Sequence, residues 1–196
     1  MYNLIYPQFN SNTNLESQKL FDLLINYIPK HPKEEADKLL MLSYLNSCDR
    51  PFERTTLPSH FTGSALLASK DFSKILLNHH LSLDKWIQFG GHADGNADLL
   101  SVAKRELEEE SGILTAEVYD ENIFDVDIQL IPANHTKGEP DHYHLDVRFL
   151  FVTEADVKFE VSHESLEMQW VNVADTNDYN NDFGFVKMIE KLRSLV

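Results

Sequence analysis

The chain has little of what covalent cross-linking or nucleic-acid binding requires. Its 196 residues include a single cysteine, Cys48, which excludes an internal disulfide. Basic residues are few, since 17 Lys and Arg stand against 32 Asp and Glu and the formal net charge is −15. Binding to nucleic acid or to an anionic membrane surface needs a basic patch, so this balance argues against non-specific binding to either.

Long apolar runs are also missing. No stretch approaches the roughly 20 apolar residues of a membrane span, and the start of the chain lacks the basic segment and apolar run of a signal peptide. We therefore expect a soluble cytoplasmic protein without a membrane partner. The length is enough for one domain with a sizeable core and a small appended segment.

The most informative stretch runs from Gly90 to Ile113. It begins as a Gly-Gly loop, and the following 98–111 segment contains no Gly or Pro and has apolar residues at helical spacing. This pattern predicts an amphipathic helix, with Gly112 where a C-terminal cap is expected.

Three glutamates share one face of this predicted helix. At about 100° per residue, Glu106, Glu109 and Glu110 fall within one arc of about 100°, whereas Glu108 points away from it. Clustered carboxylates raise one another's pKa unless a cation intervenes, and a hard divalent ion such as Mg²⁺ is the usual partner. The alternative is an acidic face that is simply solvated.

The order of residues in this stretch decides between these two interpretations. It follows G-x5-E-x7-R-E-U-x-E-E-x-G-U, where U is a bulky aliphatic residue, at eight of nine fixed positions. In order, these positions hold Gly91, Ala97, Arg105, Glu106, Leu107, Glu109, Glu110, Gly112 and Ile113. The stretch thus resembles the Nudix box, with Ala97 in place of the usual Glu.

The resemblance implies a fold and an activity. The fold would be of the α/β class, a Nudix-type α/β/α sandwich with a mixed β-sheet over residues 60–196, preceded by an N-terminal helical extension (1–59) packed on it. The activity would be divalent-metal-dependent hydrolysis of a phosphoanhydride bond in a nucleoside diphosphate linked to another moiety, with Mg²⁺ as the cofactor or Mn²⁺ in its place. The alternative is a Nudix-fold nucleotide-binding or regulatory module with little turnover, which the loss of the carboxylate at Ala97 favours.

The resemblance also assigns roles to residues. It places the metal on Gly91, Glu106, Glu109 and Glu110, and it makes Arg105 the residue that orients Glu106, so that Arg105 and the three glutamates form the catalytic group. In some relatives a late-loop glutamate is a further base or metal ligand, and here Glu164 and Glu167 are the candidates.

A predicted strand near residue 142 carries a polar face. Strand alternation puts four polar side chains on one side, namely His142, His144, Asp146 and Arg148. We expect these residues, together with His92, to bind the nucleotide substrate. Zinc binding by the histidines and an ordinary solvated face remain alternatives. The partner is then a small-molecule nucleotide, and a homodimer is possible.

The remaining periodicity predicts the following elements. Helices are expected at 15–27 and 33–46, the second with an apolar stripe of Ala36, Leu39, Leu40 and Tyr44, and a final helix is expected at 183–195. Strands are expected at 61–68, 74–79, 86–89, 115–119, 123–131, 142–149, 157–161 and 164–171. An irregular arm is expected over residues 1–12.

Overall fold

The computed structural model describes residues 15–134 and 138–196, so the arm expected at 1–12 lies outside the described residues. The helices are α1 (Leu15–Asn26), α2 (Pro32–Ser47), α3 (Leu99–Ser111) and α4 (Phe183–Arg193), with a 3₁₀ turn at Val173–Asp178. The strands are β1 (Ser59–Ser69), β2 (Lys74–His80), β3 (Lys85–Ile87), β4 (Phe89–His92), β5 (Glu117–Val118), β6 (Asp125–Ile131), β7 (His142–Thr153) and β8 (Ser165–Asn172).

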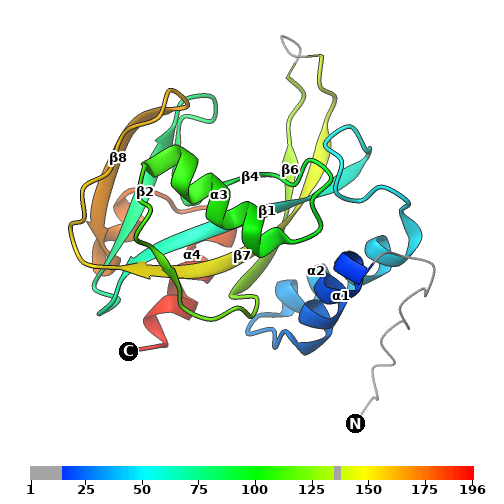
Figure 1. Cartoon of the computed structure of the whole chain (residues 1–196), viewed down its shortest axis with the longest axis horizontal. Coiled ribbons are helices and arrows are strands. Elements are labelled where there is room, and N and C mark those ends of the chain that lie inside the picture. The colour runs from blue at the N-terminus through cyan, green and yellow to red at the C-terminus, as the bar shows by residue number, and fades with distance from the viewer. Residues whose placement is uncertain (1–14, 135–137) are drawn as a thin grey trace.

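Strand β1 lies at the centre of a mixed sheet (Figure 1). Along one edge it pairs in parallel with β7 over its whole length, from Ser59 opposite Tyr143 to Ser69 opposite Thr153. Its other edge is shared between two antiparallel strands, with β4 beside residues 62–65 and β2 beside residues 67–68. The sheet therefore divides at β1, and β4 is held close to the start of both long strands.

Helices cover both faces of the sheet (Figure 1). On one face, α3 packs so closely that a Cβ atom at Gly63 would lie 2.7 Å from the carbonyl oxygen of Leu99. On the other face, α4 buries Phe185, Met188, Ile189 and Leu192 against β1, β2 and β7. This α/β/α arrangement confirms the predicted fold class and the apolar face of the last helix.

Two expected elements are wrong. Residues 157–161 form no strand and continue instead as an irregular segment towards β8. The Gly90-Gly91 pair, expected as a loop, belongs to strand β4, where the two glycines pair with Ser64 and Gly63. A Cβ at Gly90 would meet the Ser64 side chain at 2.2 Å, so the glycines are needed for close strand packing and not for a turn.

The apolar stripe expected on α2 is also wrong. Leu40 is 59% exposed, while Glu34, Asp37 and Lys38 are buried beside Met41 and Leu42. The charged residues are buried because each has a polar partner. The sequence pattern missed them because those partners lie elsewhere in the chain.

These partners belong to an ion network between the N-terminal helices, the sheet and α4. Lys33 on α2 binds Asp37 at 2.5 Å and Asp127 on β6 at 2.6 Å. Glu34 is paired with Lys187 and Lys191 on α4, and both lysines also bind Asp125. The leucines of α1 and α2 share one hydrophobic cluster with β1 and β7. The N-terminal helices are thus held to the sheet by apolar and ionic contacts together.

Arg148 lies at the centre of this network. Its guanidinium contacts the carboxylates of Asp125 at 3.0 Å, Asp127 at 3.1 Å and Asp146 at 2.7 Å. Burial opposes its charge, but Asp146, Asp125 and Asp127 together raise the pKa of Arg148 above its usual value. Its side chain is only 2% exposed, so it is placed to neutralise three buried carboxylates.

We predict that Arg148→Met lowers the free energy of unfolding by about 3–5 kcal/mol, because it leaves buried carboxylates without their main counter-charge. Urea unfolding checks this prediction. The control is Lys70→Met, which removes a pair with Glu154 whose side chains are 50% and 77% exposed, and it should leave the free energy of unfolding nearly unchanged. Equal losses in the two variants would contradict the role of Arg148.

Candidate functional site

Strand β4 and helix α3 meet where the backbone of Gly90 and Gly91 lies beside two glutamates. A Cβ at Gly91 would lie 2.5 Å from the carboxyl carbon of Glu106. The backbone N–H of Gly90 donates a hydrogen bond of 3.2 Å to Oε1 of Glu110. Only residues without a side chain allow this approach, which explains why glycine opens the motif.

Glu110 is a buried carboxylate without a basic partner among its contacts. Besides the bond from Gly90, its Oε2 accepts a hydrogen bond of 2.8 Å from the Asn78 side-chain amide on β2. Burial raises the pKa of Glu110 to about 7, and the nearby charges of Glu106 and Glu164 act in the same direction. The two neutral donors hold the carboxylate in place without neutralising it.

Glu106 lies beside Gly91 and is held by Arg105. Arg105 Nη2 is 2.8 Å from Glu106 Oε1 and donates a hydrogen bond of 3.2 Å to the carbonyl oxygen of His92. Burial raises the pKa of Glu106, and the charges of Glu109 and Glu164 add to this rise, while Arg105 opposes it. Arg105 therefore contacts both Glu106 and the end of β4.

The other two glutamates of the helix lie at its surface. The Glu109 side chain is 61% exposed and is paired with Arg105 at 3.2 Å. Glu108 lies 3.8 Å from Lys104. The structure thus brings Glu106 and Glu110 inward beside the glycines, whereas Glu109 lies at the exposed edge of the same face.

The two late-loop candidates differ in position. Glu164 precedes β8, and its charge acts on both Glu106 and Glu110. Glu167 lies within β8, where it pairs with His79 of β2. Glu164 is therefore the better placed of the two to act with the carboxylates of α3.

The residue that replaces the usual glutamate of the Nudix box lies in an apolar environment. Ala97 is 2% exposed and belongs to the hydrophobic cluster under α3. Its neighbour Asp98 caps α3, accepting a bond of 3.4 Å from the Ser101 N–H. Asp98 thus satisfies a free N–H of the helix start and does not replace the missing glutamate.

The polar side chains on one face of β7 belong to two separate groups of residues. Arg148 and Asp146 lie inside the ion network, where Asp146 also accepts hydrogen bonds from Thr62 and Ser64. The expected substrate residues His142 and His144 lie further along the same strand, at its start. The structure therefore separates Arg148 and Asp146, which are 1% and 4% exposed, from the histidines.

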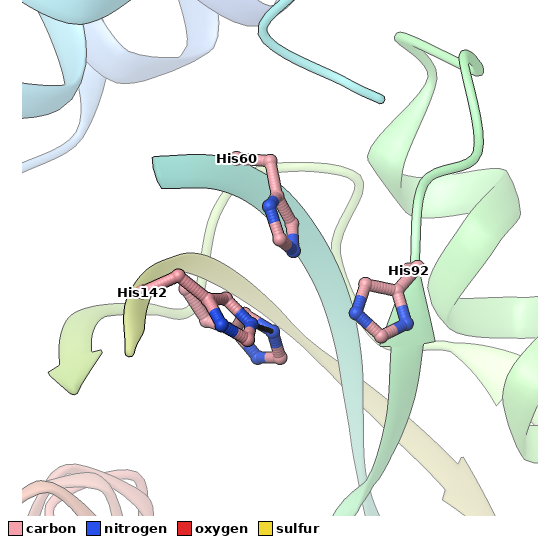
Figure 2. Close-up of side chains that lie close together, drawn as sticks. His60, His92 and His142 are labelled. Atoms are coloured by element: carbon pink, nitrogen blue, oxygen red, sulfur yellow. Dashed lines mark hydrogen bonds between the residues drawn. The ribbon is translucent and has the colours of Figure 1, made fainter. Parts of the chain in front are cut away.

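The histidines form a compact cluster that includes a residue missed by the sequence analysis. His60, His92, His142 and His144 each offer a ring nitrogen, and these four atoms lie within 4.8 Å of one another (Figure 2). Burial lowers the pKa of His144 to about 3 and that of His92 to about 4, and it also lowers the pKa of His60. Burial therefore favours the neutral form of these three rings, His60, His92 and His144.

His60 and Asn78 had no sequence signal of their own. Both are buried in strands, 1% and 0% exposed respectively, and neither belongs to a motif. Only the pairing of β1 with β4 and β7 brings His60 to the other histidines, and only the path of β2 beneath α3 brings Asn78 to Glu110.

The donor set beside the glycines fits a hard divalent cation. Glu106 and Glu110 offer carboxylate oxygens in a largely buried place, where burial raises the pKa of both and the charge of Glu106 adds to the rise at Glu110. The close approach of Gly91 leaves its backbone beside them. Oxygen ligands and uncompensated negative charge are what Mg²⁺ and Mn²⁺ require.

Comparison with known proteins agrees with this geometry. The family model for the NUDIX domain matches residues 62–192. The "Probable DHNTP pyrophosphohydrolase" of Lactococcus lactis subsp. cremoris (strain MG1363) is 31% identical over 123 residues, which are 62% of this chain and 72% of that protein.

Solved structures are similar in fold. A C. elegans Ap4A hydrolase matches with a TM-score of 0.56 at 15% identity, over 69% of this chain and 96% of that one. The E. coli dihydroneopterin triphosphate pyrophosphohydrolase matches with a TM-score of 0.54 at 15% identity, over the same shares of the two chains.

The sandwich fold is the one that these solved hydrolases share. The matched family gives the finer class: this chain belongs to the Nudix family. It is a Nudix-type pyrophosphohydrolase that acts on a nucleotide or nucleotide derivative, as the box had indicated. Within the described residues, no helix is long and apolar enough to cross a membrane.

We predict that Glu110 makes the metal-free protein less stable as the pH rises from about 4.5 to 7. Its native pKa of about 7 exceeds the ordinary value of 4.5, so in this window the native state binds more protons than the unfolded state. Relative to the parent, Glu110→Gln should therefore gain roughly 1–3 kcal/mol of unfolding free energy across the window.

Chemical unfolding in EDTA at a series of pH values measures this difference. Glu108→Gln is the control, because Glu108 lies at the helix surface near Lys104, and its difference from the parent should stay constant with pH. A constant difference for Glu110→Gln as well would show that Glu110 is not a destabilising buried carboxylate.

Proposed function

We propose that this Nudix hydrolase uses a divalent cation, Mg²⁺ or Mn²⁺, to break a phosphoanhydride bond in a nucleoside diphosphate linked to another group. One observation carries the proposal: Glu110 is buried beside Glu106, and its hydrogen bonds come from the neutral donors of Gly90 and Asn78. Two such carboxylates are costly in a buried place unless a cation is bound there.

The proposed ligands are Glu106, Glu110, the exposed Glu109 and the backbone carbonyl of Gly91. Bound there, a divalent cation supplies positive charge that stabilises the phosphoryl oxygens and activates water for attack. Arg105 keeps Glu106 in position through their 2.8 Å contact. Asn78 and Gly90 hold both oxygens of Glu110, so little reorganisation is needed when substrate binds.

Glu164 is the proposed proton acceptor. It is exposed and lies outside the helix, yet its charge acts on Glu106 and Glu110. An exposed carboxylate beside the proposed metal ligands can reach a water molecule, which suits a general base. Glu167 is kept from this role by its place within β8 opposite His79.

A panel of candidate compounds is needed to identify the substrate. The names of similar proteins refer to different compounds, a pterin triphosphate and a dinucleoside polyphosphate. The panel should therefore include nucleoside triphosphates, dihydroneopterin triphosphate, dinucleoside polyphosphates and ADP-ribose, each with Mg²⁺ or Mn²⁺. Hydrolysis of one or more compounds supports the proposal, whereas nucleotide binding without turnover would favour a binding module instead.

We predict that Glu106→Gln and Glu110→Gln each lower kcat by at least ~100-fold on the best substrate of the panel. Each change removes a negative metal ligand from a site that works by charge stabilisation. The matched control is Glu108→Gln in the same acidic run, which should stay within about twofold of the parent. Near-parental kcat in both Glu106→Gln and Glu110→Gln would refute the proposed metal site.

A second pair of variants tests the base. Glu164→Gln should lower kcat about 10- to 100-fold with little change in KM, the size expected for a general base. Glu167→Gln is the control in the same segment and should be nearly silent. The assignment fails if Glu167→Gln is the more damaging change, or if Glu164→Gln leaves kcat unchanged across the pH range.

A further inference from the structure

The histidine cluster is built from three neighbouring strands. His60 lies near the start of β1, His92 at the end of β4, and His142 and His144 at the start of β7 (Figure 2). Strand register explains why they meet: His60 is directly opposite His144, and Thr62, two residues along β1, is opposite His92. Residues two apart on a strand point to the same face, so all these rings lie on one face of the sheet.

We propose that His60, His92, His142 and His144 bind one divalent transition-metal ion, with Zn²⁺ as the best-fitting ion. This site is separate from the box glutamates, and the proposal does not depend on which nucleotide the enzyme hydrolyses. The sequence analysis favoured substrate binding for three of these histidines, and the inclusion of His60 changes that interpretation.

The distances fit a small tetrahedral ion. With Zn–N bonds of about 2.0–2.1 Å, the ligand nitrogens of a tetrahedral site lie about 3.4 Å apart. His142 Nε2 and His144 Nε2 are already 3.2 Å apart, and all four ligand atoms lie within 4.8 Å of one another. Small rotations of the His60 and His92 rings would close the remaining gap.

Backbone carbonyls orient two of the rings as metal ligands. His142 Nδ1 lies 2.8 Å from the carbonyl oxygen of Pro140, and His60 Nδ1 lies 3.3 Å from that of Thr56. A carbonyl can only accept, so in each case Nδ1 carries the proton and the Nε2 lone pair is left to accept. Nε2 of His142 accepts from His144 Nε2 at 3.2 Å, a hydrogen bond that a shared metal ion would replace. Ligating histidines characteristically donate the other ring N–H to a carbonyl or carboxylate in this way.

His60 also has an unsatisfied polar atom at the centre of the cluster. Its Nε2 is buried and has no hydrogen-bond partner among residues 15–134 and 138–196. The ring centres of the three other histidines lie 5.0–5.2 Å from that of His60. Leaving such an atom unpaired costs about 1–3 kcal/mol, and a bound metal ion would remove this cost.

Ligand chemistry separates this site from that of the glutamates. Imidazole nitrogen suits Zn²⁺ and similar ions, whereas Mg²⁺ prefers oxygen. Four protein ligands would leave no open position, so the ion would stabilise structure and would not activate water. The ion would link β1, β4 and β7, and its ligand on β4, His92, directly follows Gly91. Metal loading should therefore raise the melting temperature.

The test uses the untagged, full-length protein, stripped with EDTA and dialysed. Zn²⁺ and Co²⁺ are added separately in buffer without substrate or Mg²⁺. The expected results are one tightly bound ion per chain by elemental analysis, a higher melting temperature, and the visible absorption of tetrahedral Co²⁺. His92→Ala and His144→Ala should each weaken binding by at least ~100-fold, because losing a ligand costs more than the 10- to 100-fold loss of an outer partner.

Two controls make the outcome specific. His163→Ala removes a histidine that is 92% exposed and outside the cluster, and it should bind Zn²⁺ as the parent does. Glu110→Gln should also keep the bound Zn²⁺, which separates this site from the box. Circular dichroism establishes that each variant is folded. The proposal is overturned if the parent binds no stoichiometric Zn²⁺ or Co²⁺, or if folded His92→Ala and His144→Ala bind them as tightly as the parent.

Discussion

The pairing of β1 with its neighbours is the constraint on which the rest of the structure depends. Strand β1 pairs in parallel with β7 along its full length. Its other edge pairs with β4 and, further along, with β2. Because β4 pairs so near the start of β1, Gly91 is held facing Glu106 of α3, and the backbone N–H of Gly90 reaches Glu110. The same pairing places His60 beside His92 and His144. A shift of one residue in this register would turn every one of these groups to the opposite face.

The two faces of this sheet carry different chemistry. The face under α3 holds Glu106 and Glu110, whose oxygens suit a hard cation, and burial raises the pKa of both carboxylates. The other face carries the histidines at one end, then the carboxylates around Arg148, and finally the apolar surface covered by α4. Strand alternation alone produces this separation, since His92 and Gly91 are neighbours in sequence and point to opposite sides.

The sequence was sufficient to predict the box, its helix and the α/β/α class, because these depend on local spacing and on a long motif. It was insufficient where long-range partners decide the outcome. The burial of Glu34 and Asp37 depends on lysines of α4 and α2, so the apolar stripe expected on α2 was wrong. Arg148 was expected to bind substrate, yet its three carboxylate partners come from β6 and β7. His60 lies far in sequence from the other three histidines, and only strand register reveals its neighbours.

The most direct test of this account is a crystal structure of the protein with bound Mn²⁺, read by anomalous scattering at the manganese absorption edge. The central claim is that the buried carboxylates beside Gly91 form the site of the catalytic cation. The account predicts an anomalous peak within coordination distance of Glu106 and Glu110. Manganese bound elsewhere, with no peak at these glutamates even when a nucleotide substrate is present, would contradict it.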